Sequence, residues 1–408
     1  MVYEDPYNSN KADVMLKMLI NDDVEKDQEI IAEYYAKGMS KADFSMVMNL
    51  NKETKKIDID YIGYAYKPYN FEKFLSYQEI EQMIYNLAAS KAVNFEIIGE
   101  SVDGRNIYSL SIGFGQKTIM FETGIHAAEG GNVLFMMKYL NDLVHQYEQK
   151  DEDIIKLLNE VKIVVVPLVN PDGYLAHLFG YQKLNNQSLY AYQSAGEITY
   201  SNYKANANGI DINRSFPSQH GGLYYRKYQL SRTVSFKPTL GKMDYYAGEI
   251  LGSEPETRGI MYWQHKYLSQ SFAYISLHSA GRVIYAGKPN LSERINTNSQ
   301  VLARIVSDIN GYLALGPADE EVGIGSDGTA TDFAAELVSG FNFSTKTGRL
   351  SADAYLNPTL KSDYPIGIIT LETLEKYAFT KELLKKEYEE MKLAKVFTTL
   401  IKSYEQIK

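Results

Sequence analysis

The chain has 408 residues, of which 45% are hydrophobic and 23% are charged, as is typical of a globular protein with a large core. The formal net charge is −9 and no basic stripe occurs, so nucleic acid is not an expected partner. The absence of cysteine excludes disulfides, thiol nucleophiles and thiolate ligands, so any metal ion must be held by His, Asp or Glu.

Residues 1–68 contain no polar cluster with recognisable chemistry. Residues 29–36 and 41–48 have helical patterns, and residues 55–66 alternate as a short strand does. We therefore predict a small α-rich appendage at residues 1–68 and one large domain at residues 69–408. The first ten residues lack the basic and apolar segments of a signal peptide, and no apolar run is long enough to span a bilayer.

From residue 69 onward, strand patterns alternate with helical patterns. Ser76 and Glu79 form a capping box ahead of a helix whose apolar face contains Ile80, Ile84 and Leu87. Strands are predicted at residues 95–100, 106–112, 117–122, 162–168, 273–277 and 366–371, and further helices at residues 131–147 and 381–406.

Two features of these strands indicate the fold class. Val102-Asp103-Gly104 separates the first two strands and favours a hairpin. The strands at residues 162–168, 273–277 and 366–371 are continuously apolar, as expected where helices cover both faces of a sheet. The sequence thus predicts an α/β fold with a mixed, largely parallel central sheet and helices on both faces. In such sheets, functional side chains gather at the carboxyl ends of the strands.

Two of the six histidines lie directly after predicted strands. His126 and Glu129 follow one strand and precede a helix, so both side chains can face one metal ion. His278 follows another strand in the segment Leu-His-Ser. Each cluster alone also fits a structural histidine or a helix-capping glutamate. Together they supply the three ligands of an open zinc site, with a fourth position left for water.

Two further polar segments contain candidate functional residues. Asn213 and Arg214 place several hydrogen-bond donors in a small space, which suits a carboxylate, although a surface Asn-Arg turn fits the pattern as well. Asp211 is a candidate partner for a metal-binding histidine. Glu372 follows an apolar strand, where a carboxylate needs a partner or a role such as that of a general base.

The order of these motifs resembles that of the carboxypeptidase A-like zinc peptidases, or funnelins. The segment from Ile98 to Tyr108 also resembles the opening hairpin of that family. The resemblance extends from about residue 69 to the C-terminus and implies a carboxypeptidase A-like catalytic domain there. The motifs that carry it are His126-x-x-Glu129, Asn170-Pro171-Asp172-Gly173-Tyr174, Asp211-x-Asn213-Arg214, Leu277-His278-Ser279 and Leu371-Glu372-Thr373.

The resemblance implies a hydrolytic centre with one zinc ion as its cofactor. His126, Glu129 and His278 would bind the zinc ion, and Asp211 would orient His126. Glu372 would be the general base and then the proton donor to the leaving amine. A zinc ion in such a site activates a water molecule by lowering its pKa.

The resemblance also implies that Asn213 and Arg214 hold the free terminal carboxylate of a peptide. The chain departs from the family pattern at three places. Lys204 stands where an arginine usually faces the oxyanion, and a lysine is a point charge rather than a planar fork. Ala128 replaces an arginine within the zinc motif. Residues 320–327 contain no tyrosine, although the family places one there on a mobile loop.

The expected substrate is a peptide. Thr331 would lie near the floor of the pocket for the terminal side chain and indicates neither a deep aromatic pocket nor an acidic one. Residues 204–209 resemble the bacterial branch of the family, which includes peptidases that cleave γ-D-glutamyl–diamino acid bonds in peptidoglycan stem peptides. The expected function is zinc-dependent hydrolysis of a peptide bond next to a free carboxylate, with a stem peptide as the first candidate substrate.

Three alternatives stay open: a general peptide carboxypeptidase, an N-acyl amino acid deacylase with the same zinc triad, and a non-catalytic wall- or peptide-binding module. The Asn-Pro-Asp-Gly-Tyr and Val-Asp-Gly-Arg segments favour a peptidase over a deacylase. A wall substrate would place the protein outside the cell or in the cell envelope, although the chain shows no export signal. The sequence does not indicate the oligomeric state.

Overall fold

The computed structural model describes residues 64–185, 203–216, 246–248, 252–287, 293–321, 328–339, 366–375 and 379–403. The helices predicted at residues 29–36 and 41–48 lie outside the described residues, as do residues 322–327, where the family tyrosine is missing. Of the strand predicted at residues 55–66, only residues 64–66 are described, and they are not part of a strand. The boundary at residues 68 and 69 stays a prediction. Residues 64–66 pack on the domain, since Tyr66 stacks on His145 with ring centroids 3.7 Å apart and donates to Asp142 at 3.0 Å.

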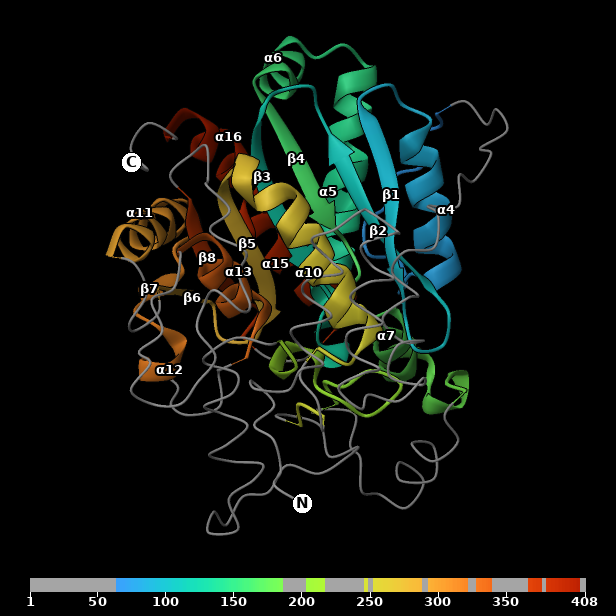
Figure 1. Cartoon of the computed structure of the whole chain (residues 1–408). Coiled ribbons are helices and arrows are strands. Elements are labelled where there is room, and N and C mark those ends of the chain that lie inside the picture. Colours follow the sequence, from blue (N-terminus) through green and yellow to red (C-terminus); the bar gives the residue numbers. More distant parts are fainter. Residues whose placement is uncertain are drawn as a thin grey trace, which may run out of the picture.

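An eight-stranded sheet forms the centre of the described part, with the order β1-β2-β4-β3-β5-β8-β6-β7 (Figure 1). The strands β4, β3, β5 and β8 are parallel to one another, and antiparallel pairs flank them on both sides. The predicted mixed, largely parallel sheet is therefore confirmed. The strands are β1 Val93–Glu100, β2 Asn106–Ile112, β3 Lys117–Thr123, β4 Val161–Val166, β5 Ser271–Ser279, β6 Val283–Ala286, β7 Leu313–Leu315 and β8 Gly367–Thr373.

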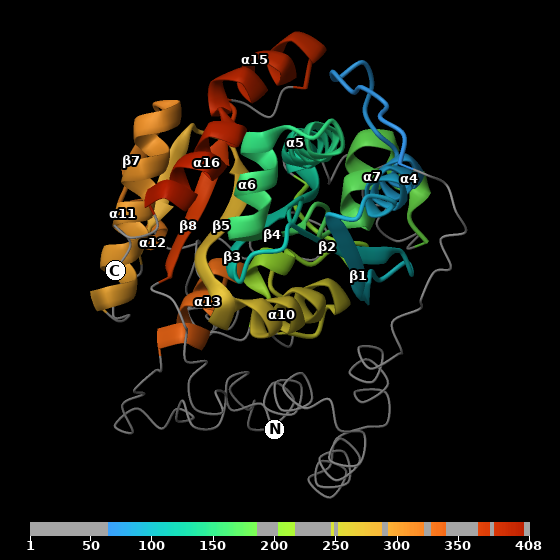
Figure 2. The ribbon, with the colours of Figure 1, turned by 90° about the horizontal axis from the view of Figure 1, so that it is seen from above.

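Helices cover both faces of the sheet, as Figure 2 shows from above: α5, α6 and α16 lie on one face, and α10 and α13 on the other. The helices are α4 Tyr77–Ala88, α5 Gly130–Glu148, α6 Glu152–Glu160, α7 Pro171–Phe179, α10 Pro255–Tyr267, α11 Glu293–Asn310, α12 Ala318–Glu321, α13 Ala330–Ser339, α15 Lys381–Met391 and α16 Leu393–Ser403. Across the described residues, none of these helices is both long and apolar enough to cross a membrane.

The central strands supply apolar side chains to two separate cores. In β4, Ile163 and Val165 belong to the core beneath α5, whereas Val164 and Val166 belong to the core beneath α10. Successive side chains of a strand point to opposite faces, so a continuously apolar strand can serve both cores. Each such fully buried side chain contributes roughly 1.5–3 kcal/mol by leaving water.

Two local predictions are confirmed in detail. The Ser76 hydroxyl accepts from the Glu79 amide, and the Glu79 carboxylate accepts from the Ser76 amide at 2.8 Å, so α4 begins with a capping box. β1 and β2 form the predicted antiparallel hairpin. Its turn includes Gly104 at φ +78°, a backbone conformation that glycine adopts readily.

The prediction of a single helix at residues 381–406 is wrong. The described residues form two helices, α15 and α16, which are separated by Lys392 in a left-handed conformation with φ +49°. In a continuous helix, Met391 and Leu393 would point about 200° apart. The break allows both side chains to be buried, and the Lys392 ammonium donates to the Ile309 carbonyl at 3.0 Å.

Candidate active site

The three predicted metal ligands come from two neighbouring parallel strands. His126 follows β3 and precedes the short 3-10 helix η1 (Ala127–Glu129), which ends at Glu129 where α5 begins. His278 is the penultimate residue of β5. Since β3 and β5 are paired in parallel, their carboxyl ends meet at one edge of the sheet and bring these side chains together.

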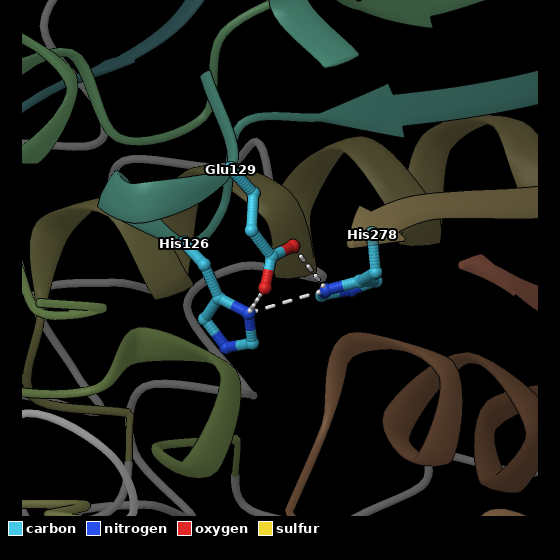
Figure 3. Close-up of side chains that lie close together, drawn as sticks. All are labelled: His126, Glu129 and His278. Carbon is cyan, nitrogen blue, oxygen red and sulfur yellow. Dashed lines mark hydrogen bonds and ion pairs between the residues drawn. The ribbon is translucent and has the colours of Figure 1, made fainter. Parts of the chain in front are cut away.

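The side chains of His126, Glu129 and His278 point toward one another (Figure 3). Glu129 Oε1 lies 2.8 Å from His126 Nδ1, and Glu129 Oε2 lies 3.0 Å from His278 Nδ1. One ligand atom from each residue lies within 4.8 Å of the other two, and all three residues are buried. Within the described part of the chain, this is the one group of three or more His, Asp or Glu residues close enough to share a metal ion.

Further polar groups surround these ligands, as the sequence predicts. Asp211 Oδ1 lies 3.2 Å from His126 Nε2, on the ring edge opposite Glu129. A carboxylate in this position orients the ring and leaves Nδ1 to face a metal ion. The Lys204 ammonium lies 3.7 Å from Glu129 Oε1. The structure thus brings Asp211 and Lys204 to the centre, while their catalytic roles stay predictions.

Glu372 reaches the same edge of the sheet from β8. Its Cα is paired directly with that of His278 in the parallel register of β5 and β8. Among the described residues, Glu372 Oε2 is buried and has no hydrogen-bond partner. A buried carboxylate oxygen without a partner is costly, and here it lies beside the metal ligands, as a general base requires.

The predicted substrate-binding residues lie nearby. Asn213 and Arg214 belong to the 3-10 helix η3 (Ile212–Arg214). Asp211 caps the start of this helix, where its carboxylate accepts a hydrogen bond from the Asn213 backbone amide at 3.1 Å. Asn213 Nδ2 lies 3.4 Å from His278 Nε2, and Asn213 Oδ1 accepts from the Ala330 amide at 2.9 Å. Asn213 therefore links the metal centre to the start of α13.

Thr331 lies in the first turn of α13 and faces β8. Its hydroxyl is 3.5 Å from that of Thr370, two residues before Glu372 and on the same side of the strand. The Arg214 side chain is buried, and its Nη1 donates to the Asn213 carbonyl at 2.7 Å. Asn213 thus contacts a metal ligand, Arg214 follows it in η3, and Thr331 contacts the strand that carries Glu372.

The sequence assigned no role to Asn170, and the structure shows that it holds two loops of the site together. Its amide donates to the Ile125 carbonyl at 3.3 Å and to the Ala205 carbonyl at 3.1 Å. These carbonyls flank His126 and Lys204. Its oxygen accepts from the Gly173 amide at 2.9 Å and begins α7. The Asn-Pro-Asp-Gly-Tyr motif was the available signal for this function.

Glu122 is a second residue without a predicted role. It is fully buried on β3, accepts hydrogen bonds from the Tyr274 and Ser276 hydroxyls, and burial raises its pKa. A charged residue inside the apolar segment Thr-Ile-Met-Phe-Glu-Thr is the sequence signal that identifies it. Ser276 precedes His278 by two residues and points to the same face of β5, so Glu122 lies beneath the metal centre.

The electrostatics of the ligands suit a cation. Burial alone would raise the pKa of Glu129, but the imidazoles of His126 and His278 hold it well below its ordinary value. Burial alone would lower the pKa of His126, but the carboxylates of Glu129 and Asp211 raise it to about 9. This raised pKa favours the protonated form of the His126 ring in the metal-free protein at neutral pH.

Metal binding is expected to release this proton. At neutral pH the folded, metal-free protein carries it because the pKa of His126 is raised to about 9, and a metal ion binds only the neutral ring. Zinc affinity should therefore increase as pH rises toward about 9 and decrease as pH falls. Calorimetric zinc titration at neutral pH in buffers of different ionisation enthalpy measures the proton release.

The matched variant is Asp211→Asn, which removes one of the two carboxylates that raise the pKa of His126. It should release fewer protons per zinc ion than the wild type does. Equal apparent enthalpies in all buffers for the wild type would contradict the prediction.

Burial raises the pKa of Glu372 to about 7, and the negative charge of Glu129 adds to this effect while His278 opposes it. A cation bound by His126, Glu129 and His278 would lower this pKa, because a nearby positive charge favours the carboxylate. Two imidazoles and one carboxylate, each fixed by a further contact, are a donor set typical of catalytic zinc. The residues present fit a zinc ion.

Comparison with known proteins agrees with this centre. A family model described as zinc carboxypeptidase, peptidase M14, matches residues 80–347. The chain is 31% identical over 257 residues to gamma-D-glutamyl-L-diamino acid endopeptidase 1 of Lysinibacillus sphaericus, and the aligned region covers 60% of each protein. It is 25% identical over 177 residues to the human carboxypeptidase N catalytic chain, and the aligned region covers 42% of this chain and 34% of that protein. The chain thus spans at most about 60% of the length of these relatives.

Two solved structures are similar in fold. Bovine thrombin-activatable fibrinolysis inhibitor, in complex with tick carboxypeptidase inhibitor, has a TM-score of 0.55 at 18% identity, covering 82% of this chain and 99% of that one. Carboxypeptidase A from Helicoverpa armigera has a TM-score of 0.56 at 17% identity, and the match covers 84% of this chain and 76% of that one. At such identities the likeness concerns the fold alone, and it confirms the predicted carboxypeptidase A-like fold.

The family match contains all three metal ligands and ends before Glu372, which the sheet register brings to the same centre. The match covers more than half of the chain, and the ligand set His126, Glu129 and His278 is assembled in the structure. The chain belongs to the zinc carboxypeptidase family, peptidase M14.

Proposed function

We propose that this protein is a zinc-dependent peptidase that hydrolyses a peptide bond next to a free carboxylate in peptidoglycan stem peptides. The observation that carries the proposal is the convergence of the His126, Glu129 and His278 ligand atoms within 4.8 Å, with Glu372 paired to His278 in the adjacent strand. Three ligands leave an open metal position, and the neighbouring carboxylate has a buried oxygen without a partner among the described residues.

Different residues of the chain have different roles in hydrolysis. When bound, zinc supplies Lewis-acid activation of a water molecule and of the scissile carbonyl. Glu372 takes the proton from the attacking water and later transfers it to the leaving amine. The Lys204 ammonium, 3.7 Å from Glu129 Oε1, supplies positive charge close to the oxygen that becomes negative. Asp211 holds the His126 ring in the orientation that directs Nδ1 to the metal.

Arg214 is expected to bind the free carboxylate of the substrate. Hydrogen bonds to charged groups contribute about 1.5–3 kcal/mol each, so Arg214→Met should lower kcat/KM by roughly 10- to 100-fold for substrates with a free terminal carboxylate. The steady-state kinetics of a peptide and its C-terminal amide, measured with both enzymes, test this role.

The amide provides the control for this experiment. It should be a poor substrate for the wild type, and Arg214→Met should cause no further loss with it, because the carboxylate and Arg214 act as one pair. An equal loss for the acid and the amide would exclude carboxylate binding by Arg214.

The substrate class rests on two observations. The relative from Lysinibacillus sphaericus, at 31% identity, is named as an endopeptidase for bonds between γ-D-glutamate and an L-diamino acid. The small, polar Thr331 beside Thr370 and close to Glu372 favours a polar side chain over a large aromatic one. Where the diamino acid is the terminal residue, its free α-carboxylate lies on the leaving side of this bond, and Asn213 and Arg214 can bind it. This substrate would place the protein outside the cell or in the cell envelope.

Mass spectrometry of muropeptides and of a C-terminal peptide library, digested with the zinc-loaded protein, tests the proposal. Cleavage after D-glutamate would support the stem-peptide substrate. Loss of one terminal residue from ordinary peptides would instead indicate a general carboxypeptidase. Hydrolysis of acetyl-aspartate but not of hippuryl peptides would indicate a deacylase. Zinc binding without any hydrolysis would support a binding module and exclude the proposed activity.

A further inference from the structure

Three buried polar side chains form a closed ring of hydrogen bonds next to the metal centre. Asn132 Nδ2 donates to Ser279 Oγ at 3.1 Å, and Thr373 Oγ1 donates to Asn132 Oδ1 at 2.7 Å. The hydroxyls of Ser279 and Thr373 are 3.0 Å apart. Each of the three residues is at most 2% exposed. We call this group the Asn132–Ser279–Thr373 triangle.

The direction of the third bond follows from the other two. The Thr373 hydroxyl has one proton, and it is donated to Asn132. Ser279 must therefore donate to Thr373, whose oxygen can still accept while its one proton is donated to Asn132. Each side chain thus donates once and accepts once around the ring. Such a cyclic network strengthens each bond by polarisation, and the loss of one member leaves two buried polar groups without partners.

The triangle connects α5, β5 and β8, which begin or end next to Glu129, His278 and Glu372. Asn132 lies in the first turn of α5, three residues after Glu129. Ser279 follows His278 in β5, and Thr373 follows Glu372 in β8. Because successive side chains of a strand point to opposite faces, Ser279 and Thr373 lie on the face of the sheet opposite to His278 and Glu372.

One contact joins the triangle directly to a metal ligand. The Ser279 backbone amide donates to Glu129 Oε2 at 3.0 Å, and the same oxygen lies 3.0 Å from His278 Nδ1. The backbone position of Ser279, which its side chain fixes through Asn132 and Thr373, therefore sets where the Glu129 carboxylate can lie. A shift of β5 against α5 would remove a donor from this carboxylate and change the distance between two ligands.

We infer that Asn132, Ser279 and Thr373 are positioning residues: their ring of hydrogen bonds sets the relative positions of Glu129, His278 and Glu372. As positioning residues, Asn132, Ser279 and Thr373 act through Glu129, His278 and Glu372 and do not contact the substrate. The consequence for catalysis rests on the proposed function, whereas the consequence for metal binding does not. Loss of a group that orients metal ligands typically lowers metal affinity or activity by about 10- to 100-fold.

Thr373→Val tests this inference, because it keeps the shape of the side chain and removes the hydroxyl. Zinc affinity, measured by competition with a chromophoric chelator, should fall by roughly 10- to 100-fold. For the zinc-saturated enzyme, kcat should decrease while KM stays near the wild-type value, because the base and the metal lose their alignment rather than a substrate contact. Thr373→Ser retains the hydroxyl and should restore both quantities.

Ser299→Ala is the matched control. Ser299 is buried on α11, and its hydroxyl accepts from the Ile368 amide at 2.9 Å, at the opposite end of β8 from Glu372. This variant also loses a buried hydroxyl with its hydrogen bonds, so it should lower the melting temperature but not the zinc affinity. An equal loss of zinc affinity in Ser299→Ala and Thr373→Val would overturn the inference, since it would reflect general destabilisation.

Wild-type zinc affinity and kcat in a folded Thr373→Val variant would also overturn it. If Thr373→Val does not fold, the same comparison with Ser279→Ala decides, because that change removes a single oxygen atom. The chelator competition needs no substrate. A wild type that binds zinc but cleaves no peptide would therefore refute the proposed function and still allow the positions of the ligands to be tested.

Discussion

Replacing Glu372 with glutamine is expected to lower kcat by roughly 10²- to 10⁴-fold, the usual contribution of a general acid–base group. Glutamine has nearly the same shape but cannot take a proton from water or give one to the leaving amine. Glu372 lies beside the ligands without belonging to the set of three, so the zinc content of Glu372→Gln should stay at the wild-type level. Rapid-quench or steady-state kinetics, together with metal analysis of the same sample, measure both quantities.

A second buried glutamate provides the control for Glu372→Gln. Glu256 is fully buried on α10, and burial together with the charges of Asp172 and Glu254 raises its pKa to about 8. Glu256 is thus largely neutral at neutral pH, and Glu256→Gln changes little charge and should keep kcat near the wild-type value. Unchanged kcat in a zinc-loaded Glu372→Gln variant would exclude Glu372 as the general base.

His278→Ala is expected to abolish both zinc retention and hydrolysis. Two ligands would remain, and the Glu129 carboxylate would lose one of the two imidazoles that hold its pKa low. The loss of zinc affinity should exceed the roughly 10- to 100-fold typical of a group that only orients a ligand. Metal analysis after dialysis and chelator competition measure it. The double variant with Glu372→Gln should be no less active than His278→Ala alone, since the two residues act as one unit.

The control for this change is another buried histidine. His177 lies on α7 and does not belong to the ligand set, and burial lowers its pKa to about 4. The variant His177→Ala should retain one zinc ion per chain and most of the activity, although it creates a cavity. Full zinc occupancy in His278→Ala would show that His278 is not a ligand.

Much of the fold was predictable because its local signals are strong. The capping box at Ser76 and Glu79 specifies where α4 begins, through hydrogen bonds between residues three apart. The apolar runs that became β4, β5 and β8 indicate strands buried on both faces. The helix break at Lys392 was not predictable, because the residues around it have good helical patterns. It depends on where Met391 and Leu393 meet the core, which is a property of the packed domain.

The candidate site also has features that were predictable from the sequence and others that were not. The identity of its ligands follows from residue types and their order: without cysteine, His126, Glu129 and His278 are the residues suited to zinc, and Glu372 is the carboxylate at a strand end. The strand register that pairs His278 with Glu372, and the contact of Asp211 with His126, came from the tertiary structure.

By itself, the sequence determined the fold class and the chemistry of the metal centre, because these depend on local periodicity and on side-chain types, and the order of its motifs indicated the family by resemblance. Only the tertiary structure decided how the centre is held. Asn132 and Thr373 are 241 residues apart in the chain and share a hydrogen bond of 2.7 Å, a contact that no local pattern encodes. The physical reason is that the sheet brings together strands distant in sequence, and polar groups buried there must find their partners across that distance.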